Sequence, residues 1–517
     1  MALEAGPRPT PPPAVTEGDL AAALRPSAIP PAPSSAPSSA DSYSDRAVRG
    51  GAITAGGNLA VQGLRLLQQV ILTRLLPQEA FGLMALVYSF RGAIDLFSDI
   101  GIGPSIIQNP RGDEPRFLDT AWTLQFGRGV GLWLFTGVCA LPMAAFYGHP
   151  ELGVLIPVAS FSAVLAGSRS TKGYSAERHL NLAWLTLIEF ISALAALVVM
   201  VVWALWSPTV WALVAGGLVG AITDVGLGHL ILPGYNGRFG WEKSVIPALV
   251  HFGKWIFLST VLTYVVNESD RLVFGKLISL AQLGVYNVAL TFASTPLSAC
   301  HALSQKVVFP LFSRVNQSGD QLPRVFRQAR RLALVVSGWV LSGLIGGGPA
   351  AVGLVYDTRY AEGGWMLQIL AIGAWLSIPE ITNSSACLAL GQPRWLALGN
   401  FSKLVGLVTL VPLGFYWHGF SGALMAYAAS ELFRYAASTL GVYRLGLQTV
   451  RQDLGFTLVV AGSSACSLFA LHRLQERGVH VVLQALAVFV VTTLVWSHWL
   501  LPYLRDALRR WGTRGAR

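Results

Sequence analysis

The stretch GGAITAGGNLAVQGLRLLQQVILTRLL (Gly50–Leu76) is the key to the fold of this chain. It is too long and too apolar for a surface helix of a water-soluble protein, yet it carries Asn58, Gln62, Arg65 and Gln69. Their spacings of four, three and four residues place them on one face of a helix. A helix in lipid cannot direct an arginine at acyl chains cheaply, so we expect this face to line a bundle interior or a water-filled cavity.

The composition of the whole chain supports a membrane protein. The 517 residues are 53% hydrophobic and only 12% charged, with a mean hydropathy of +0.53. Soluble domains average about 25% charged residues. The net charge of +11 would indicate a nucleic-acid partner in a soluble protein. Here the basic residues gather in short loops between apolar segments, so we expect contacts with membrane lipids and none with nucleic acid.

Fourteen apolar segments are long enough to cross a bilayer, which requires about 20 residues in a helix. We therefore predict an all-α polytopic membrane protein with about fourteen transmembrane helices. The predicted spans cover residues 50–76, 80–107, 121–147, 151–170, 181–206, 209–232, 248–278, 282–312, 330–356, 361–391, 395–417, 419–446, 453–473 and 479–502.

The polar face of the first span recurs 202 residues later in the chain. This shift relates the four polar positions of the first span to Thr260, Tyr264, Asn267 and Arg271. It also relates glycines, such as Gly82 and Gly284. Polar positions and glycines that keep one phase indicate an internal repeat. We expect both helices to contribute their polar faces to one shared cavity.

The repeat divides the chain into five regions. Residues 1–46 form a disordered, Pro/Ala/Ser-rich cytoplasmic tail. Residues 47–247 and 248–450 form two parallel, pseudo-symmetric six-helix bundles, related by an axis along the membrane normal. Residues 451–502 add two C-terminal helices, and residues 503–517 form a basic cytoplasmic tail.

Basic residues are distributed unequally between the two sets of loops. Loops that follow even-numbered spans are rich in arginine and lysine, including Arg169, Lys172 and Arg178, whereas those near His149 and Pro208 have none. Because such residues stay on the cytoplasmic side, this bias places both termini in the cytoplasm.

The chain lacks the sequence signatures of catalysis. There is no P-loop, no G-x-S-x-G and no H-E-x-x-H motif. The four cysteines lie inside apolar spans without metal-ligand spacing. The loops are too short for a catalytic domain, so we expect no enzymatic activity, no cofactor and no metal site.

Ionisable residues inside the spans are the candidate functional residues. Arg65 lies in mid-span without a carboxylate three or four residues away, so a structural role would require Asp95, Asp99 or Asp270 from another span. Arg91 and Asp95 are four residues apart on one helix face and are able to pair. A cavity with arginine and lysine side chains favours an anionic ligand, and guanidinium groups match phosphate geometry. The candidate substrate-binding residues are Arg65, Gln62, Asn58, Gln69, Arg91, Tyr264, Asn267, Lys306 and Lys403.

Four short stretches resemble the polysaccharide-transporter family of flippases. They are LTRLLPQEAFGLMAL (Leu72–Leu86), NESDRLVFGKLISLAQLGVYNVAL (Asn267–Leu290), FPLFSRV (Phe309–Val315) and LGQPRWLALGN (Leu390–Asn400). The resemblance covers about residues 50–450 and implies a Wzx-type translocator of the multidrug/oligosaccharidyl-lipid/polysaccharide superfamily.

The resemblance implies a substrate as well as a fold. Such proteins flip oligosaccharides linked to polyprenyl diphosphate, of the undecaprenyl type, across the bacterial inner membrane for exopolysaccharide, capsule or lipopolysaccharide O-antigen synthesis. A polysaccharide polymerase and export machinery are the implied partners. An inside-negative potential assists outward movement of the anion, by about 2.3 kcal/mol per charge per 100 mV. If translocation is coupled to an ion, the candidate carboxylates are Glu268, Asp270 and Asp95.

Other functions remain open at this point. A drug- or organic-cation antiporter of the same superfamily would favour a carboxylate-rich cavity. A lipid II flippase would also use cationic cavity residues. A membrane glycan polymerase or acyltransferase would need a larger outer loop or a His/Asp/Glu cluster, and a membrane scaffold would need no cavity at all.

Overall fold

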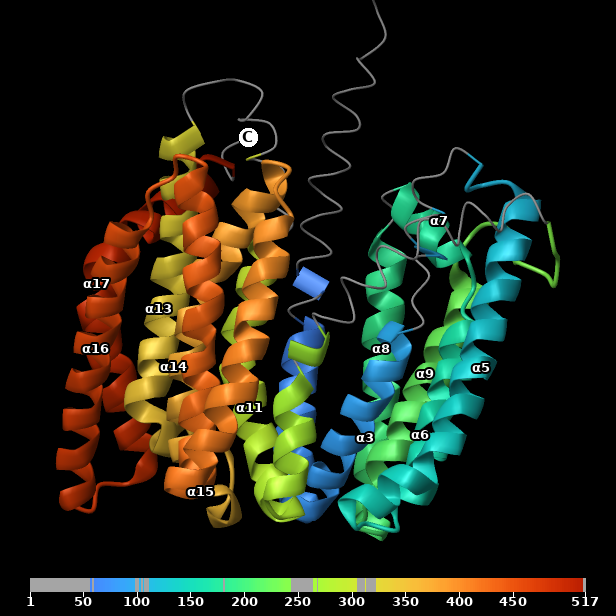
Figure 1. Ribbon diagram of the computed structural model, residues 1–517, viewed down its shortest axis with the longest axis horizontal. Coiled ribbons are helices and arrows are strands. Elements are labelled where there is room, and N and C mark those ends of the chain that lie inside the picture. The colour runs from blue at the N-terminus through green and yellow to red at the C-terminus, as the bar shows by residue number, and fades with distance from the viewer. Residues whose placement is uncertain are drawn as a thin grey trace, which may run out of the picture.

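The computed structural model describes residues 56–57, 60–97, 102–103, 106, 111–179, 182–242, 264–266, 268–304, 312 and 322–514. All regular secondary structure in these ranges is helical. The helices form two groups that stand side by side (Figure 1), and α3 of the first group packs against α11 of the second. The predicted tail at residues 1–46 lies outside the described residues.

The first group contains the N-terminal helices. They are a helix over residues 60–75, α3 (Gln78–Phe97), α5 (Pro115–Tyr147), α6 (Leu152–Gly167), the short α7 (Lys172–Arg178), α8 (Leu182–Trp206) and α9 (Trp211–Ile231). α5 packs on α6 and α8 packs on α9, as expected for antiparallel neighbours joined by short loops.

The second group contains the C-terminal helices. They are a helical segment over residues 268–277, α11 (Leu280–Leu303), α13 (Leu322–Val355), α14 (Gly363–Ala389), α15 (Arg394–Arg444), α16 (Val450–Glu476) and α17 (Val481–Arg514). α14 packs against α11, α13 and α15, whereas α16 and α17 pack on α13 at the far side of the group (Figure 1).

A sharp break divides α15 into two antiparallel arms. His418 and Gly419 leave helical geometry, and Gly419 adopts φ 58°, a left-handed conformation that favours glycine. The arms then pack closely, because a Cβ atom on Gly422 would lie 2.1 Å from the carbonyl oxygen of Gly414. The break falls at the predicted boundary between spans 395–417 and 419–446.

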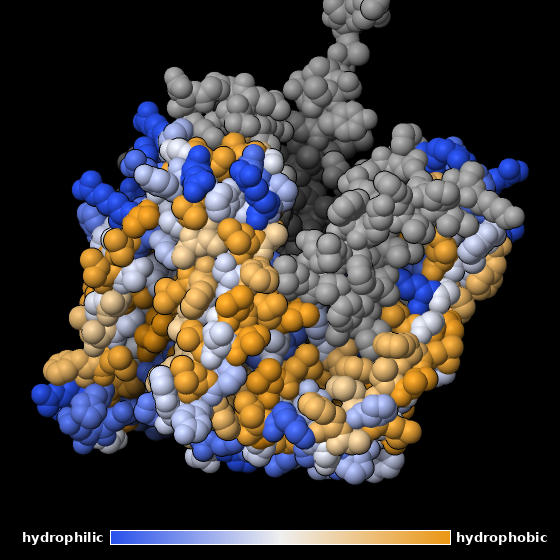
Figure 2. Space-filling model, in the orientation of Figure 1, coloured by the Kyte–Doolittle hydropathy of each residue, from blue (hydrophilic) through white to orange (hydrophobic). Residues whose placement is uncertain are grey.

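The described helices have the length and surface of membrane spans. Eight of them are long and apolar enough to cross a bilayer, with the two-armed α15 counted once. Figure 2 shows apolar residues over the middle of the visible face, with hydrophilic residues gathered at the upper and lower edges. The all-α polytopic fold is therefore confirmed, whereas the number of fourteen spans stays a prediction.

Two helices differ from their predicted lengths. α13 begins at Leu322 rather than near residue 330, so the last part of the connection between the predicted spans 282–312 and 330–356 is helical. α17 continues to Arg514, although its apolar run ends near residue 502. Good helix formers such as leucine, alanine and arginine extend both helices beyond the apolar run, because helix propensity does not depend on hydrophobicity.

The two groups meet at a reciprocal crossing of α3 and α11. A Cβ atom on Gly82 would lie 2.1 Å from the carbonyl oxygen of Leu280, and one on Gly284 would lie 2.1 Å from that of Gln78. The 202-residue shift that relates Gly82 to Gly284 also relates Gln78 to Leu280. Each glycine thus faces the residue equivalent to the one that its own counterpart faces, and a reciprocal contact of this kind is the pattern of a two-fold axis.

A second pair of contacts at the same end obeys the same shift. Arg74 donates to the carbonyl of Val355 at 3.4 Å, and Lys276 donates to the carbonyl of Phe146. Arg74 and Lys276 are also 202 residues apart, and each reaches the end of a helix in the opposite group. These contacts fasten the two groups together at the C-terminal ends of α13 and α5.

Candidate functional site

A cavity of about 340 Å³ lies between the helix over residues 60–75 and α11. We call it the central cavity. The first helix contributes Gln62, Arg65, Gln68 and Gln69 to its lining. α11 contributes a second polar wall, and α3, α8 and α9 add apolar residues. Three of the four residues of the polar face predicted for the first span, Gln62, Arg65 and Gln69, therefore line this cavity.

The polar wall of α11 was missed from the sequence. It consists of Asn287, Thr291, Ser294, Thr295 and Ser298. Four of these residues have spacings of four, three and four, as in the first span, and this spacing would have identified the wall. Thr291 and Ser298 donate their hydroxyl protons to backbone carbonyls four residues earlier, at 2.9 and 3.1 Å. Their oxygen lone pairs stay available to ligand hydroxyl groups.

Arg65 has a partner that differs from those considered from the sequence. Its Nη2 atom donates to Oε1 of Glu189 on α8 at 3.0 Å. The side chains are 57% and 46% exposed, respectively. Asp270 lies elsewhere in the protein, Asp99 is outside the described residues, and the same holds for the side chain of Asp95. An ion pair this exposed contributes little stability, typically about 0–1 kcal/mol, and it is easily broken.

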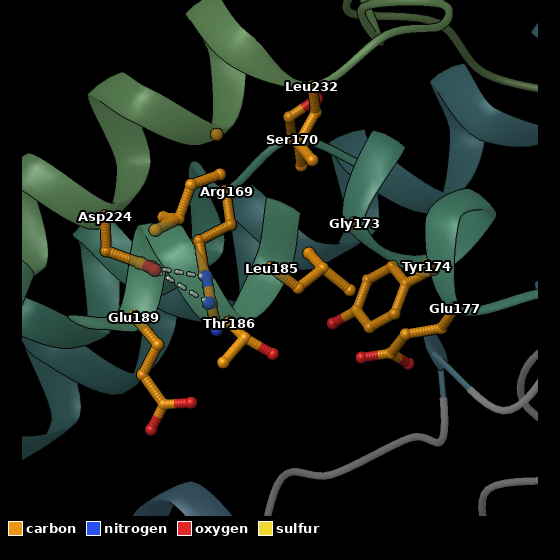
Figure 3. Close-up of a pocket in the computed structure, with 12 residues that line it drawn as sticks. Arg169, Ser170, Gly173, Tyr174, Glu177, Leu185, Thr186, Glu189, Asp224 and Leu232 are labelled. Carbon is orange, nitrogen blue, oxygen red and sulfur yellow. Dashed lines mark hydrogen bonds and ion pairs between the residues drawn. The ribbon is translucent and has the colours of Figure 1, made fainter. Parts of the chain in front are cut away.

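Glu189 also lines a second hollow of about 270 Å³ between the α6–α7 connection, α8 and α9. We call this hollow the side cavity. Figure 3 shows its residues, with Arg169 bound to Asp224. Partial burial raises the pKa of Glu177 on α7, and Arg169 acts against this shift. The Arg65–Glu189 pair joins the two cavities, because Arg65 lines one and Glu189 lines the other.

Two predicted residues connect the second group to α3 rather than line the central cavity. Tyr264 is buried and donates its hydroxyl to the carbonyl of Ser89. Glu268 accepts from the Ser89 hydroxyl at 2.9 Å and pairs with Arg271 at 2.5 Å. Both therefore hold the second half of the seventh predicted span against α3.

Lys403 and Asp270 are buried within the second group. Lys403 is 2% exposed and pairs with Glu431 at 2.5 Å, so it does not line the central cavity. The predicted ligand contact is replaced here by an internal ion pair. Asp270 is 3% exposed and accepts from the Tyr286 hydroxyl, rather than pairing with Arg271.

Of the remaining candidate substrate-binding residues, only one lies among the residues that the structure describes. Arg91 lies half-buried on α3 and does not belong to the central cavity lining. Asn58, Asn267 and Lys306 lie outside the described residues. Across the part of the chain that the structure describes, no three His, Cys, Asp or Glu residues come together to hold a metal ion.

Comparison with known proteins decides the family. Residues 71–363 match the family described as polysaccharide biosynthesis protein. The chain belongs to this family. The resemblance to polysaccharide flippases seen in the sequence is thereby confirmed.

Three proteins named for polysaccharide biosynthesis are similar to this chain. The lipopolysaccharide biosynthesis protein WzxC of Escherichia coli is 24% identical over 68% of this chain and 71% of its own length. The teichuronic acid biosynthesis protein TuaB of Bacillus subtilis is 23% identical over 64% and 65%. The succinoglycan biosynthesis transport protein ExoT of Rhizobium meliloti is 22% identical over 67% and 70%.

Solved structures of membrane transporters are similar to this protein in fold. The lipid II flippase MurJ in an inward closed conformation is 12% identical and gives a TM-score of 0.69, covering 88% of this chain and 99% of MurJ. An inward-facing multidrug resistance MATE family transporter is 14% identical and gives 0.60, covering 74% and 94%. The chain thus shares the fold of these multi-pass membrane transporters.

Proposed function

We propose that this protein flips polyprenyl-diphosphate-linked oligosaccharide repeat units across the bacterial inner membrane for surface polysaccharide synthesis. The observation that carries the proposal is the pairing of Arg65 with a wall of hydroxyl and amide groups in one central cavity. Phosphate and sugar are the two chemistries that such walls recognise. The role is transport rather than catalysis.

Each part of the substrate has a place in this arrangement. The diphosphate binds Arg65, which offers charge and a planar set of donors. The sugars exchange hydrogen bonds with Gln62, Gln69 and the α11 wall, of which Asn287 supplies an amide. The prenyl chain stays in the surrounding lipid throughout. It therefore moves between leaflets without exposing apolar surface to water. Asn58, Asn267 and Lys306 remain candidate contacts in the same proposal.

The relatives support this substrate class. WzxC, TuaB and ExoT serve lipopolysaccharide, teichuronic acid and succinoglycan biosynthesis, respectively, by their names. The three names refer to three different polymers, so what such relatives share is more consistent with the lipid-linked carrier than with one glycan. A polysaccharide polymerase and export machinery are the partners that this role implies.

The orientation and the two-bundle organisation belong to the same proposal. We place both termini and the connection over residues 313–328 in the cytoplasm, with bundles at 47–247 and 248–450 and two added helices at 451–502. The reciprocal crossing of α3 and α11 supports a repeat with the 202-residue shift. Alternating access then consists of one bundle moving against the other around the central cavity.

Labelling of introduced cysteines tests the orientation. In a variant whose four native cysteines are replaced by alanine, we expect an impermeant maleimide to label Ser207→Cys from outside intact spheroplasts. It should reach Ser318→Cys only after lysis. The opposite result would invert the orientation.

Ion coupling has a candidate group in Asp270, with Glu268 and Asp95 as the others. Asp270 is buried, and among the described residues it forms a hydrogen bond but no ion pair. The buried carboxylate Glu431, by contrast, is paired with Lys403. A buried carboxylate outside any direct ion pair takes up a proton or a cation more readily than a paired one.

Lipid II flipping is the second candidate function, favoured by the fold shared with MurJ. An organic-cation antiporter is disfavoured because the cationic Arg65 lines the central cavity. A glycan polymerase or acyltransferase has no support from the family match.

Reconstitution separates these functions. Full-length protein in liposomes is offered polyprenyl-diphosphate oligosaccharide in both leaflets, and an impermeant glycosidase is added outside. We expect all of the glycan to become accessible with the protein, but only the outer-leaflet share without it. Selective translocation of lipid II, or of an organic cation, would contradict the proposal.

A further inference from the structure

The Arg65–Glu189 pair forms part of the boundary between the central and side cavities. Only one hydrogen bond joins the two side chains, from Nη2 of Arg65 to Oε1 of Glu189 at 3.0 Å. A guanidinium group has five donors, so this contact leaves much of its capacity for a second partner. About half of each side chain is accessible, so a ligand in the central cavity can reach Arg65 without a change in the helices.

The other ion pair of the side cavity has a different geometry. Arg169 holds Asp224 with two bonds, Nε to Oδ2 at 2.7 Å and Nη2 to Oδ1 at 3.0 Å. Figure 3 shows this two-pronged pair, with the Glu189 carboxylate directed away from it. Glu189 therefore bonds to Arg65 rather than to Arg169 of its own cavity, and it does so through one oxygen.

We infer that Glu189 is an internal competitor that sets the minimum negative charge of the ligand. This inference rests on the proposed function. Any anion that binds Arg65 must either displace the Glu189 carboxylate or share the guanidinium with it. A ligand with one negative charge only replaces one anion with another and leaves Glu189 uncompensated. A diphosphate diester has about two negative charges, so its Coulomb attraction to Arg65 is about twice as large at equal distance.

The competitor has a clear use in a membrane. Anionic phospholipids contain phosphodiester groups with one negative charge each, and they surround the protein in large excess over any lipid-linked glycan. An arginine open to the bilayer would bind these headgroups. A carboxylate already in place makes such exchange unfavourable, while a two-pronged contact with a diphosphate still succeeds. Glu189 is thus a specificity residue that acts through Arg65.

Two synthetic probes test this inference. Farnesyl phosphoglucose and farnesyl diphosphoglucose differ by one phosphate group and one negative charge. Equilibrium binding is measured on purified full-length protein in an uncharged detergent. We expect the wild type to prefer the diphosphate by about tenfold or more, as two-pronged recognition of the larger charge implies.

Glu189→Gln should bind the monophosphate about tenfold more tightly and change diphosphate binding less than about threefold, because the competitor is lost but the arginine stays. Glu189→Asp keeps the charge with a shorter reach and should give an intermediate preference. This variant also covers the case in which Glu189→Gln does not fold.

Asp224→Asn is the matched control, because it removes a carboxylate of the same side cavity that does not touch Arg65. It should leave the preference unchanged. An equal fall of the preference in Asp224→Asn would assign the effect to the general potential of the cavity and overturn the inference. Equal weakening of both probes by Glu189→Gln would overturn it as well, since Glu189 would then only orient Arg65. A wild type that binds neither probe would overturn the proposed function itself.

Discussion

The ion pairs of the two helix groups lie in opposite surroundings. In the first group, Arg65 and Glu189 are 57% and 46% exposed and line cavities. In the second group, Lys403 and Glu431 are 2% and 7% exposed. The first pair lines cavities of about 340 and 270 Å³, whereas the second lies among packed helices, where Glu431 touches a cavity of only about 50 Å³. The difference teaches that an intramembrane charge indicates a binding site only when it also faces a cavity.

The buried charges of the second group form a connected network. Arg434 pairs with Glu431 at 3.2 Å and with Glu380 at 3.4 Å, so two acids and two bases neutralise one another. Arg330 and Asp453 form another buried pair between α13 and α16. Such groups hold helices in register, and their loss leaves an uncompensated charge.

The largest expected effect is the loss of a buried partner. Lys403→Met should leave Arg434 alone against the two carboxylates of Glu431 and Glu380, and lower the stability of the second group by about 3–5 kcal/mol. We expect a sharp fall in membrane abundance and in the melting temperature measured by size-exclusion chromatography. Lys403→Met combined with Glu431→Gln should restore most of both. Normal abundance in the single variant would mean that Lys403 is not a structural residue.

The next effect is the loss of the exposed arginine. Arg65→Ala should reduce glycan translocation about hundredfold. It removes the protein's side of the charge pair between Arg65 and the substrate diphosphate, and such a loss costs about 2–5 kcal/mol. Abundance should stay normal, because Glu189 remains solvated. Arg65→Lys should keep part of the activity, with the charge but not the two-pronged contact.

Arg473→Ala is the control for Arg65→Ala. Arg473 is 61% exposed and pairs with Glu476 near the end of α16, away from both cavities. It should translocate at the wild-type rate. Normal translocation by Arg65→Ala would remove the contrast between the two helix groups.

A smaller effect is expected where the groups cross. Gly82→Ala or Gly284→Ala places a methyl group against a backbone carbonyl of the other group and should destabilise the protein by about 1–3 kcal/mol. The double variant should lose less than the sum, because both changes separate the same helices. Gly462→Ala, with open space around its α16 position, is the control for the melting experiment.

The smallest effect concerns an exposed pair outside the membrane. The hydrogen bond from Arg359 lowers the pKa of Asp357 in the loop between α13 and α14. A lowered folded pKa means that the stabilisation is full above the unfolded value of about 3.9 and is lost as pH falls through the folded value. Asp357→Asn should cost less than about 1 kcal/mol at pH 7. The difference in melting temperature from wild type should disappear in acid.

Much of the fold could be predicted because the bilayer fixes the length of apolar runs. The spans predicted at 181–206 and 209–232 agree with α8 and α9 within two residues at each end. The break at His418 and Gly419 was also predicted, since both apolar runs end there. The helical ends of α13 and α17 were missed because helices continue beyond the apolar run.

The candidate site was only partly predictable. Gln62, Arg65 and Gln69 were found because their spacing fixes a helix face. Glu189 was not identified as the partner of Arg65, since contacts between distant spans depend on how helices are rotated in the bundle. The hydroxyl residues of α11 were overlooked because serine and threonine satisfy their own donors within a helix. The sequence does not show that Lys403 has a partner, Glu431, on the other arm of α15.

The crossing of Gly82 and Gly284 lies near one end of α3 and α11, so it acts as a fulcrum. α11 has 24 residues, so it is about 36 Å long at 1.5 Å per residue. A rotation of about 10° around the crossing would move the far end by about 6 Å over that length. The contact at the fulcrum would hardly change. Such a rotation would widen the far end of the cavity by about the width of a sugar ring, while the helix crossing at Gly82 and Gly284 stays intact.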